Sequence, residues 1–144
     1  MIYKAQVKDA TIVAELAVKV WTSASVEDLT QEFKELLVSE DSATCLYIIN
    51  NVPIGFAQCQ LRQDYVEGTE TSPVGYLEGV YVEPNHRKQG YAKALVKACE
   101  AWAKDKGCTE FASDCELHNT DSLAFHLHSG FEEANRIICF TKKL

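Results

Sequence analysis

The stretch Tyr76–Ala92 reads YLEGVYVEPNHRKQGYA and predicts a strand, a turn and the start of a helix. Its first half is rich in β-branched and aromatic residues, which are typical of strands, and Pro84-Asn85 marks a turn. From residue 90 to residue 106 the apolar residues recur at helical spacing. The first N–H groups of such a helix lack intrahelical partners and the helix dipole adds positive charge, so this corner suits a phosphate or a pyrophosphate.

The turn has the form Arg87-x-x-Gly90-x-Ala92, which is neither a Walker loop nor the G-x-G-x-x-G loop of dinucleotide-binding folds. Gly90 permits a ligand to approach the backbone closely, and the small side chain of Ala92 leaves the first helical turn unobstructed. Arg87 and Lys88 can add charge-assisted contacts to an anion. The structural alternative is an ordinary strand–turn–helix corner with a solvated basic residue.

The composition is that of a single globular domain spanning residues 1–144, with enough apolar residues (47%) to bury a core. The net charge of −7 disfavours a nucleic-acid partner, which would need a basic face. It favours cationic ligands, although many proteins are acidic only for solubility. No apolar run approaches the length of a membrane span, and the first residues lack a signal-peptide profile. We therefore expect a cytoplasmic protein without a membrane partner.

The six cysteines are scattered and form no C-x-x-C pair. Several fall inside predicted strands or helices, so we expect buried free thiols rather than disulfides. Cys115, His118, His126 and His128 are close in sequence, but their spacing matches no zinc pattern. We therefore expect no metal site.

Periodicity and turn residues predict an alternating order of strands and helices. Strands are expected at residues 3–7, 44–49, 54–61, 74–82, 109–114 and 137–142, and helices at residues 10–21, 25–38, 90–106 and 119–129. Asn50-Asn51 predicts a tight hairpin turn between the second and third strands. The helix over 90–106 predicts a right-handed parallel βαβ unit. The fold class is therefore α/β (α+β), with a mixed, mostly antiparallel sheet and a central parallel βαβ unit. Ligands bind beyond the carboxyl ends of parallel strands, near Val82, Asp114 and Asn119.

The strand, the Arg87-x-x-Gly90-x-Ala92 loop and a second motif, Asn119-x-x-Ser122 followed by Gly130-Phe131, together resemble the GCN5-related N-acetyltransferases. The resemblance implies that family's acyl-CoA acyltransferase fold and acetyl-CoA as the cosubstrate. It also implies that backbone groups of the strand pair with the pantetheine arm like an added strand. The positions that it assigns to acetyl-CoA are Val80, Tyr81, Val82, Arg87, Lys88, Gln89, Gly90, Tyr91, Ala92, Lys93 and Asn119.

At a position where the family often has a tyrosine that protonates the leaving thiolate, this chain has His126. An imidazole titrates near neutrality and could supply that proton. A packed or coenzyme-contacting role for His126 is the alternative. No cysteine has an obvious histidine partner in the sequence, so direct acyl transfer is expected rather than a covalent cysteine mechanism.

The segments YLEGVYVEPNHR and GCTEFASD, with the Trp21 region, resemble the aminoglycoside 6'-N-acetyltransferases. That resemblance assigns the cationic substrate to Trp21, Tyr65, Glu78 and Asp114. Glu116 and Glu133 are weaker candidates near the same mouth. Carboxylates and flat aromatic surfaces suit a polycation covered in hydroxyl groups.

Glu78 or Asp114, directly or through water, is the candidate that accepts the ammonium proton. Gly79, next to Glu78, predicts a β-bulge, which in the family exposes a backbone N–H that can stabilise the oxyanion. The structural alternatives are that Glu78 faces water or pairs with a lysine, that Asp114 is a turn residue, and that Trp21 belongs to the core.

Two further functions stay open. One is acetylation of another amine, on a polyamine, a metabolite or a protein. The other is a non-catalytic module that binds coenzyme A or a cationic drug. The apolar terminal strand over 137–141 could pair with another chain, and the resemblance also implies a homodimer.

Overall fold

The computed structural model describes residues 1–144 as a five-stranded sheet with helices on both faces. The strands are β1 (Ile2–Lys4), β2 (Ser42–Ile49), β3 (Val52–Arg62), β4 (Val74–Val82) and β5 (Phe111–Ser113). The α-helices are α1 (Ala10–Ala17), α2 (Val26–Val38), α3 (Tyr91–Asp105) and α4 (Thr120–His128), with short 3-10 turns at Val7–Asp9 and Pro84–His86. The strand order β1-β2-β3-β4-β5 follows the sequence.

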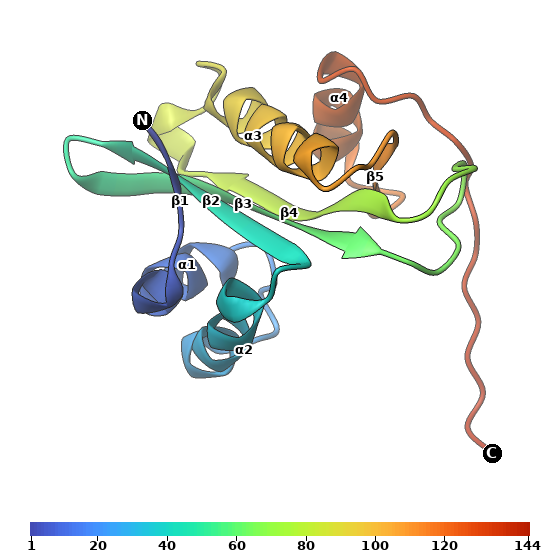
Figure 1. The fold of residues 1–144 in the computed structure, drawn as a ribbon, viewed down its shortest axis with the longest axis horizontal. Helices are drawn as coiled ribbons and strands as arrows, with labels where there is room; N and C mark the ends of the chain where they lie inside the picture. Colours follow the sequence, from blue (N-terminus) through green and yellow to red (C-terminus); the bar gives the residue numbers. More distant parts are fainter.

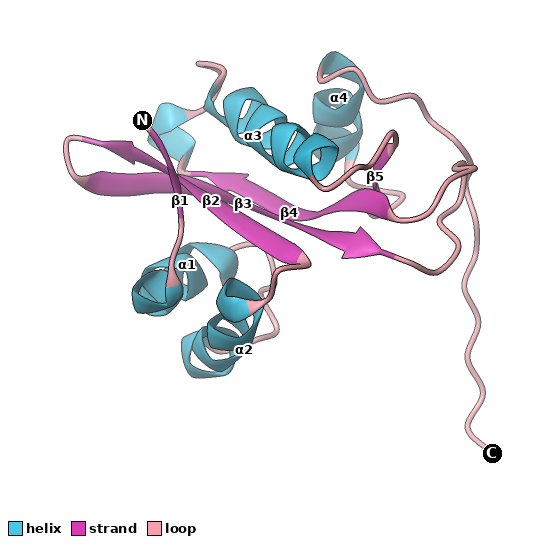
Figure 2. Ribbon diagram, in the orientation of Figure 1, coloured by secondary structure: helices cyan, strands magenta, loops and turns pink.

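The two faces of the sheet carry separate apolar cores. The helices α1 and α2 cover one face, and α3 and α4 lie on the other (Figures 1 and 2). Phe33 and Phe56 pack edge to face in the first core, with ring centroids 6.4 Å apart. Leu77, Leu95 and Cys99 belong to the second core, between the sheet and α3. The sheet is therefore buried on both sides, and the ligand sites lie at its edges.

Local signals of the sequence explain where the elements begin and turn. The Ser25 side chain accepts a hydrogen bond from the Asp28 N–H at 3.1 Å and caps α2, as predicted. Asn50 and Asn51 both have positive φ, 50° and 64°, which a tight hairpin turn requires. The predicted hairpin between β2 and β3 is confirmed.

The β4–α3–β5 segment is a parallel βαβ unit, as predicted. Its parallel pairing covers only Gly75 to Leu77 of β4. On the other side, β4 pairs with β3 as far as Val82. The residues from Glu78 to Val82 therefore have no strand partner on the β5 side, and we call this segment the free edge of β4.

A β-bulge at Glu78 interrupts the pairing between β3 and β4. Gln58 faces Gly79 and Cys59 faces Leu77, so Glu78 is the extra residue on β4. The bulge predicted from Gly79 is confirmed. A Cβ on Gly79 would lie 2.7 Å from the ring of Trp21, so only glycine lets this ring pack against the strand.

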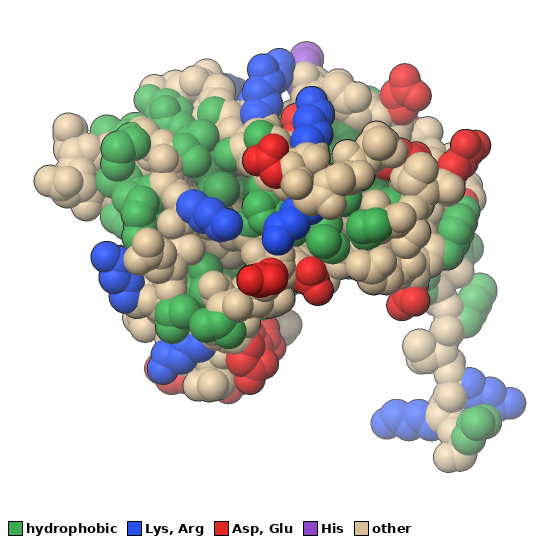
Figure 3. Space-filling model, in the orientation of Figure 1, with side chains coloured by type: hydrophobic (Ala, Val, Ile, Leu, Met, Phe, Trp, Pro, Cys, Tyr) green, Lys and Arg blue, Asp and Glu red, His purple; other side chains and the backbone are tan.

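The prediction of a strand over residues 137–142 is wrong for this chain. The last residues of the chain run away from the body as an extended segment (Figures 1 and 3). Ile138 and Phe140 are 79% and 88% exposed. A strand needs a neighbouring edge to supply its hydrogen bonds, and this segment pairs with no strand of its own chain. The parallel pair therefore lies at one end of the strand order and not at its centre.

Other boundaries and environments also differ from expectation. The helix α1 ends at Ala17, so Trp21 lies in the turn that follows it. Four of the six free cysteines are buried, as expected, but Cys115 and Cys139 are exposed. No three His, Cys, Asp or Glu side chains are grouped so that they could hold a metal ion. None of the helices is long and apolar enough to cross a membrane.

We expect Phe33→Ala to lower the free energy of unfolding by about 3–5 kcal/mol, because the change leaves a cavity in a packed aromatic cluster. Phe33 is 1% exposed and contacts the rings of Trp21 and Phe56. Val38→Ala on the same helix is the control, since Val38 is 67% exposed. Urea unfolding of both variants measures the difference. Equal midpoints would contradict the assignment of Phe33 to the core.

Candidate active site

A large cleft, of about 660 Å³, lies beside Arg62 at the end of β3, Tyr76 near the start of β4, and β5. It is bounded by α4 and the chain that follows it. Residues 132–136 form one wall of the cleft. The Asn135 side chain donates a hydrogen bond to Glu67 at 2.9 Å, and a Cβ on Gly68 would lie 2.5 Å from the Ala134 side chain. This contact fastens the wall to the loop over 63–73.

Carboxylates dominate the charged lining of this cleft. The acidic side chains are Glu67, Glu100, Glu110, Asp114, Glu116, Glu132 and Glu133. The only basic side chains are Arg62 and Arg136, and each is already paired with a carboxylate, Glu78 and Glu133 respectively. The cleft therefore attracts cations and concentrates them.

A smaller cavity, of about 320 Å³, lies on the α2 side of the sheet. Trp21, Phe33 and Leu29 form its apolar part, and Glu32 and Glu78 bring negative charge. Glu78 lines this cavity, whereas its ion-pair partner Arg62 lines the large cleft. The Arg62–Glu78 pair therefore joins the two spaces.

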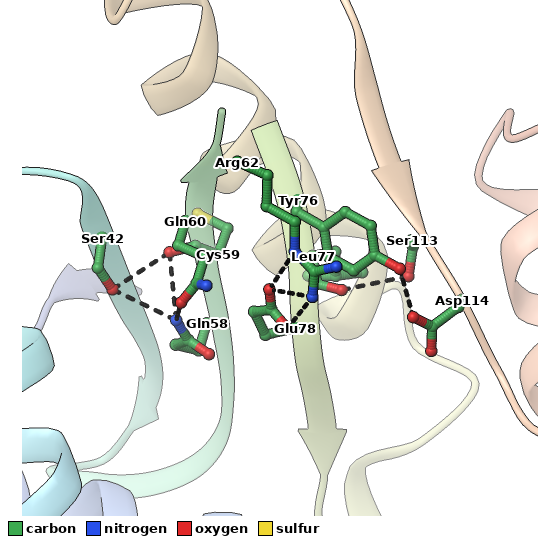
Figure 4. Close-up of polar contacts among 10 residues, drawn as sticks. All are labelled: Ser42, Gln58, Cys59, Gln60, Arg62, Tyr76, Leu77, Glu78, Ser113 and Asp114. Atoms are coloured by element: carbon green, nitrogen blue, oxygen red, sulfur yellow. Dashed lines mark hydrogen bonds and ion pairs between the residues drawn. The ribbon is translucent and has the colours of Figure 1, made fainter. Parts of the chain in front are cut away.

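Arg62 and Tyr76 link the two carboxylates that the sequence singled out. The Arg62 guanidinium donates to Glu78 Oε1 from Nε at 3.1 Å and from Nη2 at 2.8 Å, and Nη2 also reaches Oε2 at 3.0 Å (Figure 4). The same guanidinium stacks 3.5 Å from the centroid of the Tyr76 ring. The Tyr76 hydroxyl in turn donates to Asp114 Oδ2. Glu78 is thus paired with an arginine and not with a lysine, and its side chain is only 19% exposed.

Tyr76 stays protonated in this network. Burial raises the pKa of its hydroxyl well above the ordinary value, and the hydrogen bond to Asp114 raises it further. The hydroxyl is therefore a permanent donor that fixes one oxygen of Asp114. The rest of the Asp114 carboxylate faces the cleft, because Asp114 is exposed and lines it.

His126 has hydrogen-bond partners at both ring nitrogens. Nδ1 lies 2.7 Å from the carbonyl oxygen of Ser122, and Nε2 lies 2.8 Å from Ser113 Oγ. A carbonyl only accepts, so Nδ1 carries a proton in this arrangement. The ring also packs edge to face on Phe131, with centroids 5.1 Å apart. His126 lines the cleft and joins α4 to β5, so the structure gives it the packed role; the acid role stays a prediction.

The start of α3 offers a row of free backbone donors. Gly90 is the N-cap with φ 86°, and no side chain caps the helix. The first helical hydrogen bond runs from Ala94 N to Gly90 O, and the N–H groups from Lys88 to Lys93 donate to no protein atom. These amides and the helix dipole leave positive potential at this corner, which an anion site requires, and the binding of an anion here stays a prediction.

The basic side chains of this corner differ in what they do. Arg87 donates from Nε to the Val82 carbonyl at 2.8 Å and so ties the loop to the end of β4. The remaining guanidinium nitrogens of Arg87 have no partner. Lys88 and Lys93 are exposed and unpaired. Arg87 thus stabilises the loop, and the Lys88 and Lys93 side chains are available to bind an anion.

The other positions predicted for acetyl-CoA follow the same path. Val80, Tyr81 and Val82 lie on the free edge of β4, and Gln89 and Ala92 flank Gly90 and Tyr91 at the start of α3. The Tyr91 ring packs on Tyr47 with centroids 4.5 Å apart. The Tyr81 side chain turns away from this path, because its hydroxyl donates to Glu83 and its ring packs with the first core.

Asn119 already has a structural contact. Its side chain accepts a hydrogen bond from Ser122 N at 3.1 Å and caps α4. The position begins the predicted helix, and Gly130 ends it with φ 91°.

The residues predicted to bind the substrate line the large cleft and the smaller cavity. Tyr65, Asp114 and Glu116 line the large cleft, where Tyr65 is 77% exposed. Trp21 and Glu78 line the smaller cavity. Trp21 also packs on Phe33 and Phe56, with centroids 6.4 and 6.1 Å apart, so it belongs to the core and to the cavity wall at once.

Sequence reasoning missed Arg62 and Tyr76. Arg62 ends β3, and its partner Glu78 lies 16 residues further along the chain. Only the register between β3 and β4 brings the two side chains together. The available signal was that Arg62 and Glu78 sit on the facing strands of one antiparallel pair.

Several proteins similar to this chain are acetyltransferases. Residues 10–131 match the Acetyltransferase (GNAT) family. The chain is 42% identical over 130 residues to an aminoglycoside N(6')-acetyltransferase type 1 of Acinetobacter haemolyticus, covering 90% of this chain and 89% of that protein. It is 39% identical to the same type of enzyme from Stenotrophomonas maltophilia, over 94% of this chain and 88% of that protein.

A solved structure shares the whole architecture. The aminoglycoside acetyltransferase AAC(6')-Iy, in complex with the bisubstrate analog CoA-S-monomethyl-acetylneamine, matches with a TM-score of 0.95 at 34% identity, over 100% of this chain and 98% of that chain. Because the family match spans the fold and includes the helix corner at Gly90, this chain belongs to the Acetyltransferase (GNAT) family.

Proposed function

We propose that this protein transfers the acetyl group of acetyl-CoA to the 6'-amine of aminoglycoside antibiotics. The free edge of β4 carries this proposal. It runs from the anion site at the start of α3 to Glu78, where the acidic cleft and the smaller cavity meet. An extended pantetheine arm can pair with this edge as an added strand, while its diphosphate meets the amides at Lys88–Lys93.

The acidic cleft supports a polycationic acceptor. Its carboxylates are spread over the loop at Glu67, the end of β5 at Asp114 and the wall at Glu132–Glu133. Spread charges of this kind suit a ligand with several ammonium groups better than one with a single charge. The relatives named above are aminoglycoside N(6')-acetyltransferases, and one solved relative holds an acetylneamine joined to CoA.

The chemistry is direct acyl transfer. The neutral amine attacks the thioester carbon, a C–N bond forms, the C–S bond breaks, and coenzyme A leaves as a thiolate that takes up a proton. The nitrogen loses its proton to Asp114 or Glu78, the two carboxylates that the Arg62–Tyr76 network connects. A backbone N–H beside the bulge stabilises the oxyanion, and holding both reactants in place supplies much of the acceleration.

We infer the setting of this reaction from the same features. Buried free thiols at Cys45, Cys59, Cys99 and Cys108 fit the reducing cytoplasm, where acetyl-CoA is present. Acetylation removes a positive charge from the drug, and resistance of the host cell is the expected consequence. Residues 1–144 act as one domain that contains both the coenzyme and the acceptor sites.

Expected losses in Asp114→Asn and Glu78→Gln test the catalytic assignment. Each should lower kcat by roughly 10²–10⁴, because proton transfer in the transition state loses its acceptor. Thiol release from acetyl-CoA is the assay, with paired aminoglycosides that carry a 6'-amine or a 6'-hydroxyl. Asp105→Asn, at the far end of α3, is the control and should keep full activity.

Turnover with the 6'-amine compound alone establishes the position of acetylation. Tight coenzyme binding without thiol release for any aminoglycoside would overturn the drug assignment and direct the search to other amines.

Gly90→Ala should weaken acetyl-CoA binding about tenfold, or about 1.4 kcal/mol, because the strained backbone moves the amides out of line. Gly107→Ala is a matched control at the other end of α3. Both glycines have left-handed φ, 86° and 91°, and a Cβ would meet nothing within 4 Å at either. Both variants should lose similar stability, and only the first should lose coenzyme affinity in calorimetry. Equal affinities would place the diphosphate elsewhere.

We propose a homodimer that uses the terminal segment 137–144. The first four residues of this segment are apolar, and Ile138 and Phe140 are 79% and 88% exposed. The segment pairs with no strand of its own chain, so another chain can add it to a sheet edge. Light scattering should give a dimer at micromolar concentration, and Ile138→Ser with Phe140→Ser should give a monomer. Val52→Ser, an exposed apolar residue on the β2–β3 hairpin, is the control and should remain dimeric. A wild-type monomer would refute the proposal.

A further inference from the structure

Arg62 is a cation held firmly inside an acidic site. It ends β3, and its side chain runs back over the Tyr76 ring to reach Glu78. The side chains of Arg62 and Glu78 are 39% and 19% exposed, so solvent screens the pair only in part. A stacked guanidinium with three hydrogen bonds to one carboxylate has little freedom to move.

The pair is neutral, whereas its surroundings are not. From β4 it is faced by Tyr76, which stays protonated, and from the end of β5 by Asp114. On the α2 side Glu32 lines the same cavity as Glu78, and in the large cleft Tyr65 lines the wall together with Arg62. Arg136 does not reach this point, because it is paired with Glu133 on the cleft wall.

Glu78 keeps room for one further hydrogen bond. Its Oε1 accepts two of the guanidinium N–H groups and its Oε2 accepts one. A carboxylate offers about four lone-pair positions, so one remains, on Oε2. That position lies at the bulge, where the free edge of β4 begins and where an extended pantetheine arm would end.

We propose that Arg62, by pairing with Glu78, makes this carboxylate a charge-neutral binding site for the reacting nitrogen. The acceptor's 6'-amine binds there as the free base. The unpaired carboxylates of the cleft hold the other ammonium groups of the acceptor. This inference rests on the proposed function and deepens it. Arg62 is a positioning residue: it acts on the nitrogen through Glu78 and through its charge.

The physical reason is the sign of the charge next to the amine. An unpaired carboxylate would stabilise a bound ammonium and hold the nucleophile in its unreactive form. A guanidinium beside the carboxylate cancels that attraction and repels an ammonium, which favours loss of its proton. A hydrogen bond from the neutral amine to Oε2 remains available, so orientation is kept while the charge preference is removed.

The test counts the protons that are released when the acceptor binds. Calorimetry in buffers of different ionisation enthalpy is done with a 6'-amine aminoglycoside and with its 6'-hydroxyl counterpart, in the absence of acetyl-CoA. The difference between the two ligands reports the 6'-nitrogen alone. At a pH where the free amine is protonated, the wild type should release close to one more proton with the 6'-amine compound.

Variants assign this proton release to Arg62. Arg62→Met should reduce the difference toward zero, and Arg62→Lys, which keeps the charge, should retain most of it. Arg136→Met is the matched control: it removes the same charge from the same cleft, but at Glu133, and should keep the wild-type difference. In turnover, Arg62→Met should also move the acidic limb of the kcat–pH profile upward by about one pH unit.

Each outcome has one meaning. An equal difference in proton release in the wild type and in Arg62→Met would overturn this inference. Tighter acceptor binding in Arg62→Met with an unchanged kcat–pH profile would also overturn it, because Arg62 would then only compete with the substrate's ammonium group for Glu78. Binding with the predicted proton release but no thiol release from acetyl-CoA would overturn the proposed function alone. No binding of either aminoglycoside would overturn both.

Discussion

The site depends on the point where β4 loses β5 as its partner. Parallel pairing stops at Leu77 and Ser113, and the next residue, Glu78, is a bulge on the β3 side. β4 stays paired with β3 as far as Val82, but on the β5 side its backbone has no strand partner from Glu78 to Val82. One local departure from regular pairing thus leaves the strand edge along which we propose that the cosubstrate binds.

The two ends of the free edge of β4 carry electrostatic potential of opposite sign. At one end, the amides of the first turn of α3 and the helix dipole supply positive potential without a side-chain cap. At the other end, carboxylates from four separate parts of the chain surround a cleft. The Arg62–Glu78 pair lies at the inner boundary, where it holds a carboxylate in place without adding to the negative charge. This distribution of charge suits the proposed anionic cosubstrate at one end and the proposed cationic acceptor at the other.

The local parts of this arrangement could be predicted from the sequence. Asn50-Asn51 and Gly90 act through their own backbone geometry, and Ser25 acts through a local side-chain hydrogen bond. Each is found in the predicted role of turn, helix start or cap. Gly79 predicted the β-bulge, because a glycine in a strand lets a neighbouring group pack closely against the backbone, and here that group is the Trp21 ring. The family and its fold follow from the same short motifs. The roles of Asp114, Glu116 and Tyr65 remain predictions, although the structure does bring these residues into one cleft.

The sequence by itself therefore determined the order of the elements as far as α4, the start of α3 at Gly90 and the acidic character of the chain. These features depend on neighbours along the chain and on composition. Tertiary structure alone decided that Arg62 meets Glu78, that Tyr76 meets Asp114 and that Trp21 is shared between core and cavity. Those contacts depend on strand register, which sets distances between residues far apart in the sequence. It also decided that residues 137–142 stand free, since an apolar β-forming segment becomes a strand only where an edge is available to pair with it.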